Sequence, residues 1–241
     1  MPPLRDMLEP NDIDGAYAVQ SINTRRWIEQ GRRLVGRKIG LTAKAVQAQL
    51  GVDQPDFGAL FADMQIVDGG VLDAATVLQP KAEAEIAFLL ARDIDDPNVT
   101  EDAVAAAIEH AVIAIEIVDS RIADWKITFA DTVADNGSSA FFVLGSERHR
   151  LGALDLYTCG MVMEVNGSVA SLGAGAACLG HPLNAVRWLA QTLAARGEAL
   201  KAGDIILSGA LGPMITLHPG DLIRAQVGGI GSCAFSYGTS A

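Results

Sequence analysis

Residues 80–88 read PKAEAEIAF and place Glu83 and Glu85 two positions apart. Side chains on a β-strand alternate between its faces, so these two carboxylates point the same way, while Ile86 and Phe88 point to the other side. Two like charges this close need compensation, and Mg²⁺ or Mn²⁺ prefers oxygen ligands. The stretch therefore predicts a strand with a hydrophobic back. Its front is either half of a metal site or, in the plainer interpretation, a solvated acidic face.

A second stretch, residues 112–118, reads VIAIEIV. As a strand it turns its three isoleucines to one face and Glu116 to the other. A carboxylate on an otherwise apolar strand is rarely buried unless it is paired or binds a metal. If the two strands are neighbours, Glu83, Glu85 and Glu116 supply three oxygen ligands and leave positions for water and substrate.

The composition excludes several classes of protein. The chain has 241 residues, half of them apolar, and a net charge of −11, which disfavours nucleic-acid binding. Its three cysteines are widely spaced and lack zinc-site spacing, which is typical of free thiols in a reducing compartment. No secretory signal and no apolar run of about 20 residues is present, so we expect a cytoplasmic protein without a membrane span.

The remaining patterns predict an α+β fold rather than alternating β-α-β units. We expect a helical N-terminal segment, residues 1–65, that contributes to the site, and a β-rich catalytic body, residues 66–241, in one structural unit. Asn11 and Asp12 are candidate caps of the first helix. The expected helices cover residues 13–30, 43–50, 100–110 and 182–196. The expected strands cover residues 33–41, 71–72, 80–88, 112–118, 203–208, 221–227 and 232–237, with a hairpin over 161–172 that turns at Asn166-Gly167.

Two further residues stand out, of which Lys38 is a candidate for acid–base chemistry. Lys38 lies between Gly36 and Gly40 on a predicted strand, where a substrate has room to approach, and a partly desolvated lysine transfers protons. The plainer interpretation is an exposed strand lysine. Asp56 lies in QPDFG, residues 54–58, whose composition predicts a turn that the aspartate simply caps.

Residues 124–139, DWKITFADTVADNGSS, predict a polar loop that includes Ser138. Such loops often carry function, although an ordinary loop rich in Asp, Asn and Ser has the same composition. His110 and His181 lie at predicted helix ends, where structural roles are the simpler interpretation.

The ordered motifs GRKIGLT, QPDFG, PKAEAEIAF, EIVDSRI, DTVADN, GAGAACLGHPLNAV and LKAGDIILSG resemble the bacterial 2-keto-4-pentenoate hydratases of the fumarylacetoacetate hydrolase superfamily. The resemblance extends from about residue 14 through nearly the whole chain. Gly137 stands where an alanine is usual, and the N-terminus is somewhat shorter than is typical.

The resemblance implies a mixed β-roll fold and a Mg²⁺ or Mn²⁺ ion held by Glu83, Glu85 and Glu116. It also implies that Lys38 and Asp56 are acid–base residues. The substrate would be a small 2-oxo or 2-hydroxydienoic acid from aromatic meta-cleavage catabolism, and the assembly a homo-oligomer of five or ten copies. The chemistry further suggests Ser208 as a holder of the substrate carboxylate, with Ser138 as a second substrate-binding candidate.

Three alternatives stay open. The first is a 4-oxalocrotonate decarboxylase of the same superfamily, which shares the metal site. The second is a C–C bond hydrolase, whose His/Glu arrangement has no obvious counterpart here. The third is a non-catalytic metal-binding subunit that associates with a pathway decarboxylase or aldolase. A substrate with a second carboxylate would need another cation, for which Arg121 and Lys126 are candidates.

Overall fold

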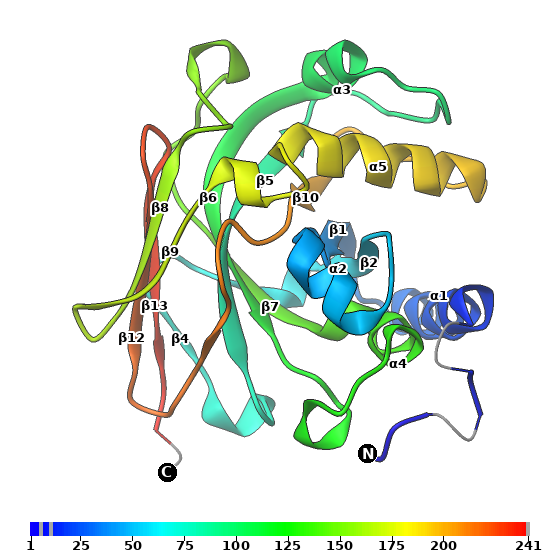
Figure 1. Cartoon of the computed structure of the whole chain (residues 1–241), viewed down its shortest axis with the longest axis horizontal. Coiled ribbons are helices and arrows are strands. Elements are labelled where there is room, and N and C mark those ends of the chain that lie inside the picture. Colours follow the sequence, from blue (N-terminus) through cyan, green and yellow to red (C-terminus); the bar gives the residue numbers. More distant parts are fainter. Residues whose placement is uncertain (5–6, 10–11, 240–241) are drawn as a thin grey trace.

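The computed structural model describes residues 1–4, 7–9 and 12–239, in which two β-sheets and several helices form one α+β body (Figure 1). The larger sheet has the strand order β2-β1-β10-β5-β6-β7-β3, and β11 pairs with β5 off this path. The smaller sheet has the order β4-β13-β12-β8-β9 and lies on the left of Figure 1, opposite α1 and α5. The α+β prediction is confirmed.

The helices are α1 (Ile13–Glu29), α2 (Lys44–Leu50), α3 (Glu101–Ala107), α4 (Phe129–Ala134) and α5 (Pro182–Ala195). The larger sheet contains β1 (Leu34–Gly40), β2 (Asp56–Phe61), β3 (Gln65–Ile66), β5 (Lys81–Leu90), β6 (Ile108–Val118), β7 (Ser139–Leu144), β10 (Ile205–Leu207) and β11 (Ile215–Thr216). The smaller sheet contains β4 (Gly70–Leu72), β8 (Gly160–Val165), β9 (Ser168–Ala174), β12 (Leu222–Val227) and β13 (Gly231–Tyr237).

Strands β5 and β6 form the centre of the larger sheet as an antiparallel pair, and Glu83 lies directly opposite Glu116. The alternating residues Ala84, Ile86 and Phe88 of β5 are buried in the main hydrophobic core. Burying such side chains contributes about 25 cal/mol per Å² of apolar surface, so this face fixes the register of the strand. The register in turn places the two glutamates of β5 on the opposite face.

Two helices show how local sequence fixes element ends. Asp12 caps α1, because its side chain accepts a hydrogen bond from the Gly15 N–H; Asn11 lies outside the described residues. His181 caps α5 by accepting from the Leu183 N–H through Nδ1, and Pro182 occupies the first turn. The structural interpretation of His181 is confirmed. Within the described residues, no helix combines the length and apolar character needed to cross a membrane.

Three local predictions were wrong. Asp56 does not lie in a turn: it opens β2, since it pairs with Gly40 of β1. The predicted loop over 124–139 contains α4, which begins at a capping box between Thr128 and Asp131. His110 lies inside β6 rather than at a helix end, because the chain becomes extended from Ile108.

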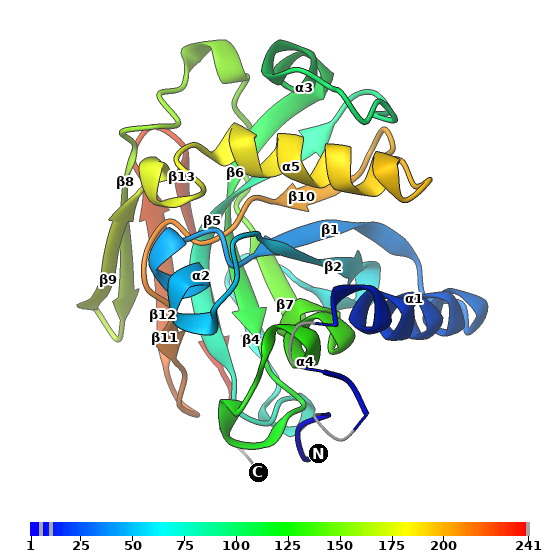
Figure 2. The ribbon, with the colours of Figure 1, turned by 45° about the vertical axis from the view of Figure 1, so that its right-hand side comes forward.

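The segment before residue 66 supplies two strands to the larger sheet. β1 pairs with β2 and, in parallel, with β10, which continues to β5. Figure 2 shows β1 and β2 beside β10 and β5, with α1 running below β2. Lys38 and Asp56 are thereby carried by the same sheet that carries the three glutamates.

Candidate active site

Three glutamates converge on one face of the central strand pair. Glu83 and Glu85 come from β5, and Glu116 comes from the paired position on β6. One carboxylate oxygen from each of them lies within 4.8 Å of the others. A divalent cation coordinated by several oxygens at about 2.0–2.6 Å requires ligand atoms at this mutual separation.

The burial of these acids is the main physical constraint on the site. Glu85 and Glu116 are 0 % exposed, and Lys38 and Asp56 are each 2 % exposed. Buried charges are expensive unless they are paired, and here four carboxylates face one lysine. Asp56 Oδ1, Glu85 Oε1 and both carboxylate oxygens of Glu116 lack an aligned hydrogen bond. An all-oxygen donor set with unpartnered buried atoms fits a hard divalent cation.

Lys38 links β1 to the glutamates. Its Nζ lies 3.1 Å from Glu116 Oε2, an ion pair without hydrogen-bond alignment. Burial by itself lowers the pKa of Lys38, but the carboxylates of Glu116 and Asp56 outweigh it and raise the pKa. Without a metal, Lys38 is therefore protonated and partly neutralises the cluster.

Asp56 and Lys38 both extend toward Gly40 of β1, where the absence of a side chain leaves room for the two groups. A Cβ on Gly40 would lie 2.3 Å from Asp56 Oδ1 and 3.3 Å from Lys38 Nζ. Any other residue at position 40 would push the two groups away. Burial raises the pKa of Asp56, and Lys38 opposes that rise. A carboxyl group with a raised pKa beside a lysine is suited to proton transfer.

The glutamates themselves hold protons more tightly than free carboxylates do. Burial, and then the Glu116 charge, raise the pKa of Glu83 to about 7. Burial also raises the pKa of Glu85 and of Glu116. A cation at the cluster would remove this penalty, since it favours the ionised form of each carboxylate.

The turn after β10 supplies further polar groups. Ser208 is buried, and its Oγ lacks an aligned hydrogen bond, whereas its N–H donates to Ile86 O. The next residue, Gly209, donates its N–H to Glu85 Oε2 at 2.7 Å. Ser138, the other candidate, is buried with its Oγ 3.1 Å from Thr132 Oγ1. Of the two hydroxyls, that of Ser208 is the unpartnered one.

Ser138 was a candidate from the sequence, but the sequence did not reveal that its neighbours Asn136 and Gly137 support β2 and Lys38. All three have a left-handed φ, and Gly137 at +62° has the residue type that tolerates it best. Asn136 clamps β2: its Oδ1 accepts from Ala59 N–H at 2.7 Å and its Nδ2 donates to Ala59 O at 3.0 Å. A Cβ on Gly137 would lie 3.2 Å from Lys38 Cδ. The Asn-Gly pair was the available signal, since both residues favour left-handed turns.

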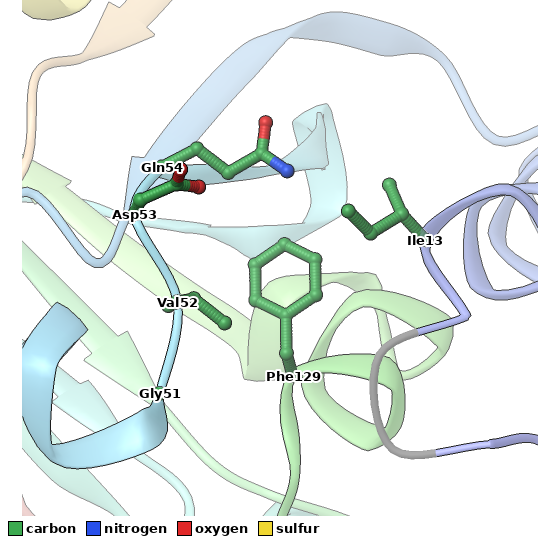
Figure 3. A pocket seen from close by; sticks show the side chains of 6 residues that line it. All are labelled: Ile13, Gly51, Val52, Asp53, Gln54 and Phe129. Carbon is green, nitrogen blue, oxygen red and sulfur yellow. The ribbon is translucent and has the colours of Figure 1, made fainter.

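A separate hollow of about 410 Å³ lies between the start of α1, the loop after α2 and α4 (Figure 3). Its lining includes Ile13, Val52 and Phe129, with Asp53 and Gln54 at one side. None of the five charged residues described above lines it. The acid cluster, not this hollow, therefore has the groups that chemistry requires.

The fold and the acid cluster define a class of protein. A model of the fumarylacetoacetate hydrolase C-terminal family matches residues 35–236, so the chain belongs to that family. It is 55% identical over 230 residues to 2-keto-4-pentenoate hydratase 1 of Dechloromonas aromatica (strain RCB), covering 95% of this chain and 88% of the relative. The resemblance to the hydratases is confirmed.

Two other relatives sharpen the comparison. A 2-hydroxyhexa-2,4-dienoate hydratase of Comamonas testosteroni is 44% identical, covering 98% of this chain and 90% of that protein. The solved 4-oxalocrotonate decarboxylase of Pseudomonas putida G7, complexed with magnesium and adipate, is 38% identical with a TM-score of 0.93. That match covers 98% of this chain and 90% of the decarboxylase. The two chemistries thus share one fold.

Proposed function

We propose that this protein is a metal-dependent hydratase that adds water to 2-hydroxypenta-2,4-dienoate and yields 4-hydroxy-2-oxopentanoate in aromatic meta-cleavage catabolism. One observation carries the proposal: three glutamates converge within 4.8 Å beside a buried Lys38 and Asp56. The 55% identity to a curated hydratase supports the choice of reaction.

Glu83, Glu85 and Glu116 are the residues proposed to hold Mg²⁺ or Mn²⁺. The bound ion would supply positive charge beside the substrate's carboxylate and enol oxygen. The Gly209 N–H fixes one oxygen of Glu85, so this ligand is oriented before any ion binds. The unpartnered Ser208 hydroxyl is proposed to hold the substrate, with Ser138 as the weaker candidate because its hydroxyl lies beside that of Thr132.

Lys38 and Asp56 are proposed to move the protons. The enol O–H of the dienol loses its proton, and C5 gains one, which gives an α,β-unsaturated ketone. Water then adds its oxygen to C4, and C3 gains a proton, so the net change is one water molecule. Burial excludes bulk water from both residues, and Asp56 Oδ1 and Lys38 Nζ both approach Gly40, so each is proposed to exchange protons with a substrate bound there.

The decarboxylase is the second candidate, and the charges of the site disfavour it. Its substrate has a second carboxylate, which needs another cation. The Arg121 guanidinium is already bound to Asp135 Oδ1 at 2.6 Å and to Asp119 O at 2.6 Å. The Lys126 ammonium lies 2.9 Å from Asp124, and both side chains are exposed. Both of these cations are thus already paired with carboxylates, so neither is left to bind a second substrate carboxylate, and a substrate with one carboxylate fits better.

The non-catalytic alternative is a metal-binding subunit associated with a pathway decarboxylase or aldolase. It would not require a buried lysine and a buried aspartate beside the glutamates. Burying those two groups costs free energy of folding, which favours a catalytic role. We further propose, from the resemblance, a cytoplasmic homo-oligomer of five or ten copies, whose mass in solution light scattering can measure.

The decisive experiment follows the ultraviolet absorbance of 2-hydroxypenta-2,4-dienoate with Mg²⁺ and then with excess EDTA. A parallel assay measures carbon dioxide released from 4-oxalocrotonate. We expect metal-dependent loss of the dienol and no carbon dioxide. Carbon dioxide release with little hydration would instead assign the decarboxylase, and no turnover of either substrate by the metal-loaded protein would refute both.

A further inference from the structure

Lys81 continues the row of charged side chains on β5. Lys81, Glu83 and Glu85 are each two positions apart and therefore lie on the same face of the strand. Along this row the side chains become accessible: Glu85 is buried, whereas Glu83 and Lys81 are half-buried. Glu83 is also the one residue of the five-residue charged site that is not fully buried. The accessible side of the cluster is therefore the side on which Lys81 lies.

An aromatic ring holds the Lys81 side chain in place. Its Nζ lies 4.3 Å from the ring centroid of Trp125, a distance at which the ammonium is attracted to the ring face. The Trp125 indole N–H donates to Gln79 O at 2.9 Å, which ties the ring to the start of β5. This arrangement orients the lysine without neutralising its charge.

The turn that presents Trp125 is conformationally unfavourable. Asp124 has φ of 59° and Trp125 has φ of 53°, both left-handed and neither a glycine. Each such residue costs about 1–2 kcal/mol, and strain of this kind clusters at functional sites. The segment that adopts this unfavourable conformation is the one that holds the Trp125 ring under Lys81.

The charge of Lys81 is available to a ligand. Among the described residues, no carboxylate lies within ion-pair distance of its ammonium, which rests over the Trp125 ring. The charges deeper in the site sum to an excess of negative charge: four carboxylates oppose Lys38 and one divalent cation, which leaves one negative charge. An anionic substrate would therefore be repelled unless a further cation stood at the entrance.

We propose that Lys81, held over Trp125 at the accessible side of the glutamate cluster, captures the carboxylate of the incoming substrate. The inference rests on the proposed hydratase function. It assigns the substrate carboxylate to the accessible side of the site. The carboxylate stays near Lys81 and Glu83, so carbons C3 to C5 point inward to Lys38 and Asp56. Substrates with a second carboxylate at the inner end would meet the Asp56 charge and be disfavoured.

The test compares Lys81→Met, which keeps the apolar stem, with Lys81→Arg, which keeps the charge. For Lys81→Met we expect kcat/KM for 2-hydroxypenta-2,4-dienoate to fall about tenfold at low salt, with kcat nearly unchanged. The deficit should shrink to about twofold at high salt, because screening removes the contribution of the charge. Lys81→Arg should retain most of the activity. Lys201→Met, which removes an exposed lysine paired with Asp93, serves as the matched charge control.

A calorimetric titration with Mg²⁺ separates capture from a structural role. Removing a positive charge beside Glu83 should leave the Mg²⁺ affinity of Lys81→Met unchanged or higher. A weaker Mg²⁺ affinity, or a loss of kcat equal to the loss of kcat/KM, would mean that Lys81 merely supports the fold of the site. An unchanged kcat/KM at low salt would also overturn the proposal.

Failure of the hydratase assignment and failure of the Lys81 proposal give different results. If the unaltered protein does not hydrate the dienol, the hydratase assignment is wrong, and the Lys81 proposal, which rests on it, is wrong as well. If it does hydrate the dienol, Trp125→Leu gives a second test that leaves the lysine in place. We expect kcat/KM to fall threefold to tenfold, which corresponds to the loss of one cation–π interaction, while kcat and Mg²⁺ affinity are preserved. No loss in this variant would show that the ring does not position Lys81.

Discussion

Glu83 is the residue at which the metal hypothesis is most directly tested. Its carboxylate is half-buried, faces Glu116 across the strand pair, and has a pKa raised to about 7. We expect Glu83→Gln to fold, to bind Mg²⁺ at least about tenfold more weakly, and to lose about a hundredfold in kcat/KM. The metal-free variant should be as stable as the parent or more stable, because one of the mutually repelling charges is gone.

Isothermal titration with Mg²⁺, the dienol assay and thermal melts together check this expectation. The control is Glu147→Gln, which neutralises an acid whose side chain is 65% exposed and far along the chain from the cluster. If Glu83→Gln keeps both its activity and its Mg²⁺ affinity, the metal assignment is wrong.

Asp56 permits a separate test of proton transfer. Asparagine has the same shape as aspartate but cannot exchange a proton, and Asp56 is buried with a raised pKa. We expect Asp56→Asn to lower kcat by about 10²–10⁴-fold while Mg²⁺ affinity changes little, which is a different pattern from that of Glu83→Gln. Asp63→Asn, at an exposed ion pair with Arg32, provides the control. Wild-type kcat in Asp56→Asn would restrict the acid–base role to Lys38.

At the scale of elements, the turn over residues 136–138 couples α4 to β2. The Asn136 side chain makes two hydrogen bonds to the backbone of Ala59, as a neighbouring strand would. Gly137 lies beside the stem of Lys38. We expect Asn136→Ala to lower the free energy of unfolding by about 2–4 kcal/mol, since two buried backbone groups lose their partner. It should also lower kcat, because the Lys38 side chain loses its support, without weakening Mg²⁺ binding.

Urea unfolding and steady-state kinetics test this turn. The comparison variant is Thr132→Val, which removes the nearby contact to Ser138 but leaves the clamp on β2 intact. It should lose about 1 kcal/mol of stability and keep kcat. Equal losses of kcat in the two variants would show that the turn has no specific effect on Lys38.

Strands β5 and β6 show why part of the site was predictable from the sequence. The period of two in β5 placed Glu83 and Glu85 on one face, and the hydrophobic pattern of β6 isolated Glu116. Those predictions depend only on local alternation along a strand. The strand position of Asp56 was missed because its Pro-Asp-Phe-Gly context has turn composition, while pairing with Gly40 decides its conformation. Such pairing is tertiary, so no window of sequence around residue 56 contains it.

At the scale of the whole molecule, the site exists only when distant strands pair. Lys38 reaches Glu116 because β1 joins β10, which is contributed by residues 205–207, and β10 joins β5. The strands were individually predictable, but their order in the sheet was not, since parallel pairing of β1 with β10 connects residues far apart in the chain. Metal binding, which depends on this pairing, should therefore be linked to global stability.

Linkage of metal binding to stability makes stability depend on pH. In the metal-free protein the pKa of Glu83 is raised from its ordinary value of 4.5 to about 7, and those of Glu85 and Glu116 are raised as well. The folded state then binds more protons than the unfolded chain between about pH 4.5 and pH 7, so stability falls as pH rises through this window. The raised pKa of Lys38 contributes nothing to this change, because the lysine is protonated in both states there.

We therefore expect the melting temperature of the metal-free protein to be lower at about pH 8 than at about pH 5.5. Mg²⁺ binds the ionised carboxylates, so it should raise the melting temperature more at pH 8. At 100 times the dissociation constant the added stability is about 2.7 kcal/mol. Differential scanning fluorimetry with Mg²⁺ or EDTA at both pH values measures the effect, and Glu83→Gln should flatten it. Equal Mg²⁺ stabilisation at the two pH values would show that the cluster is ionised throughout, and the raised carboxylate pKa values would then be wrong.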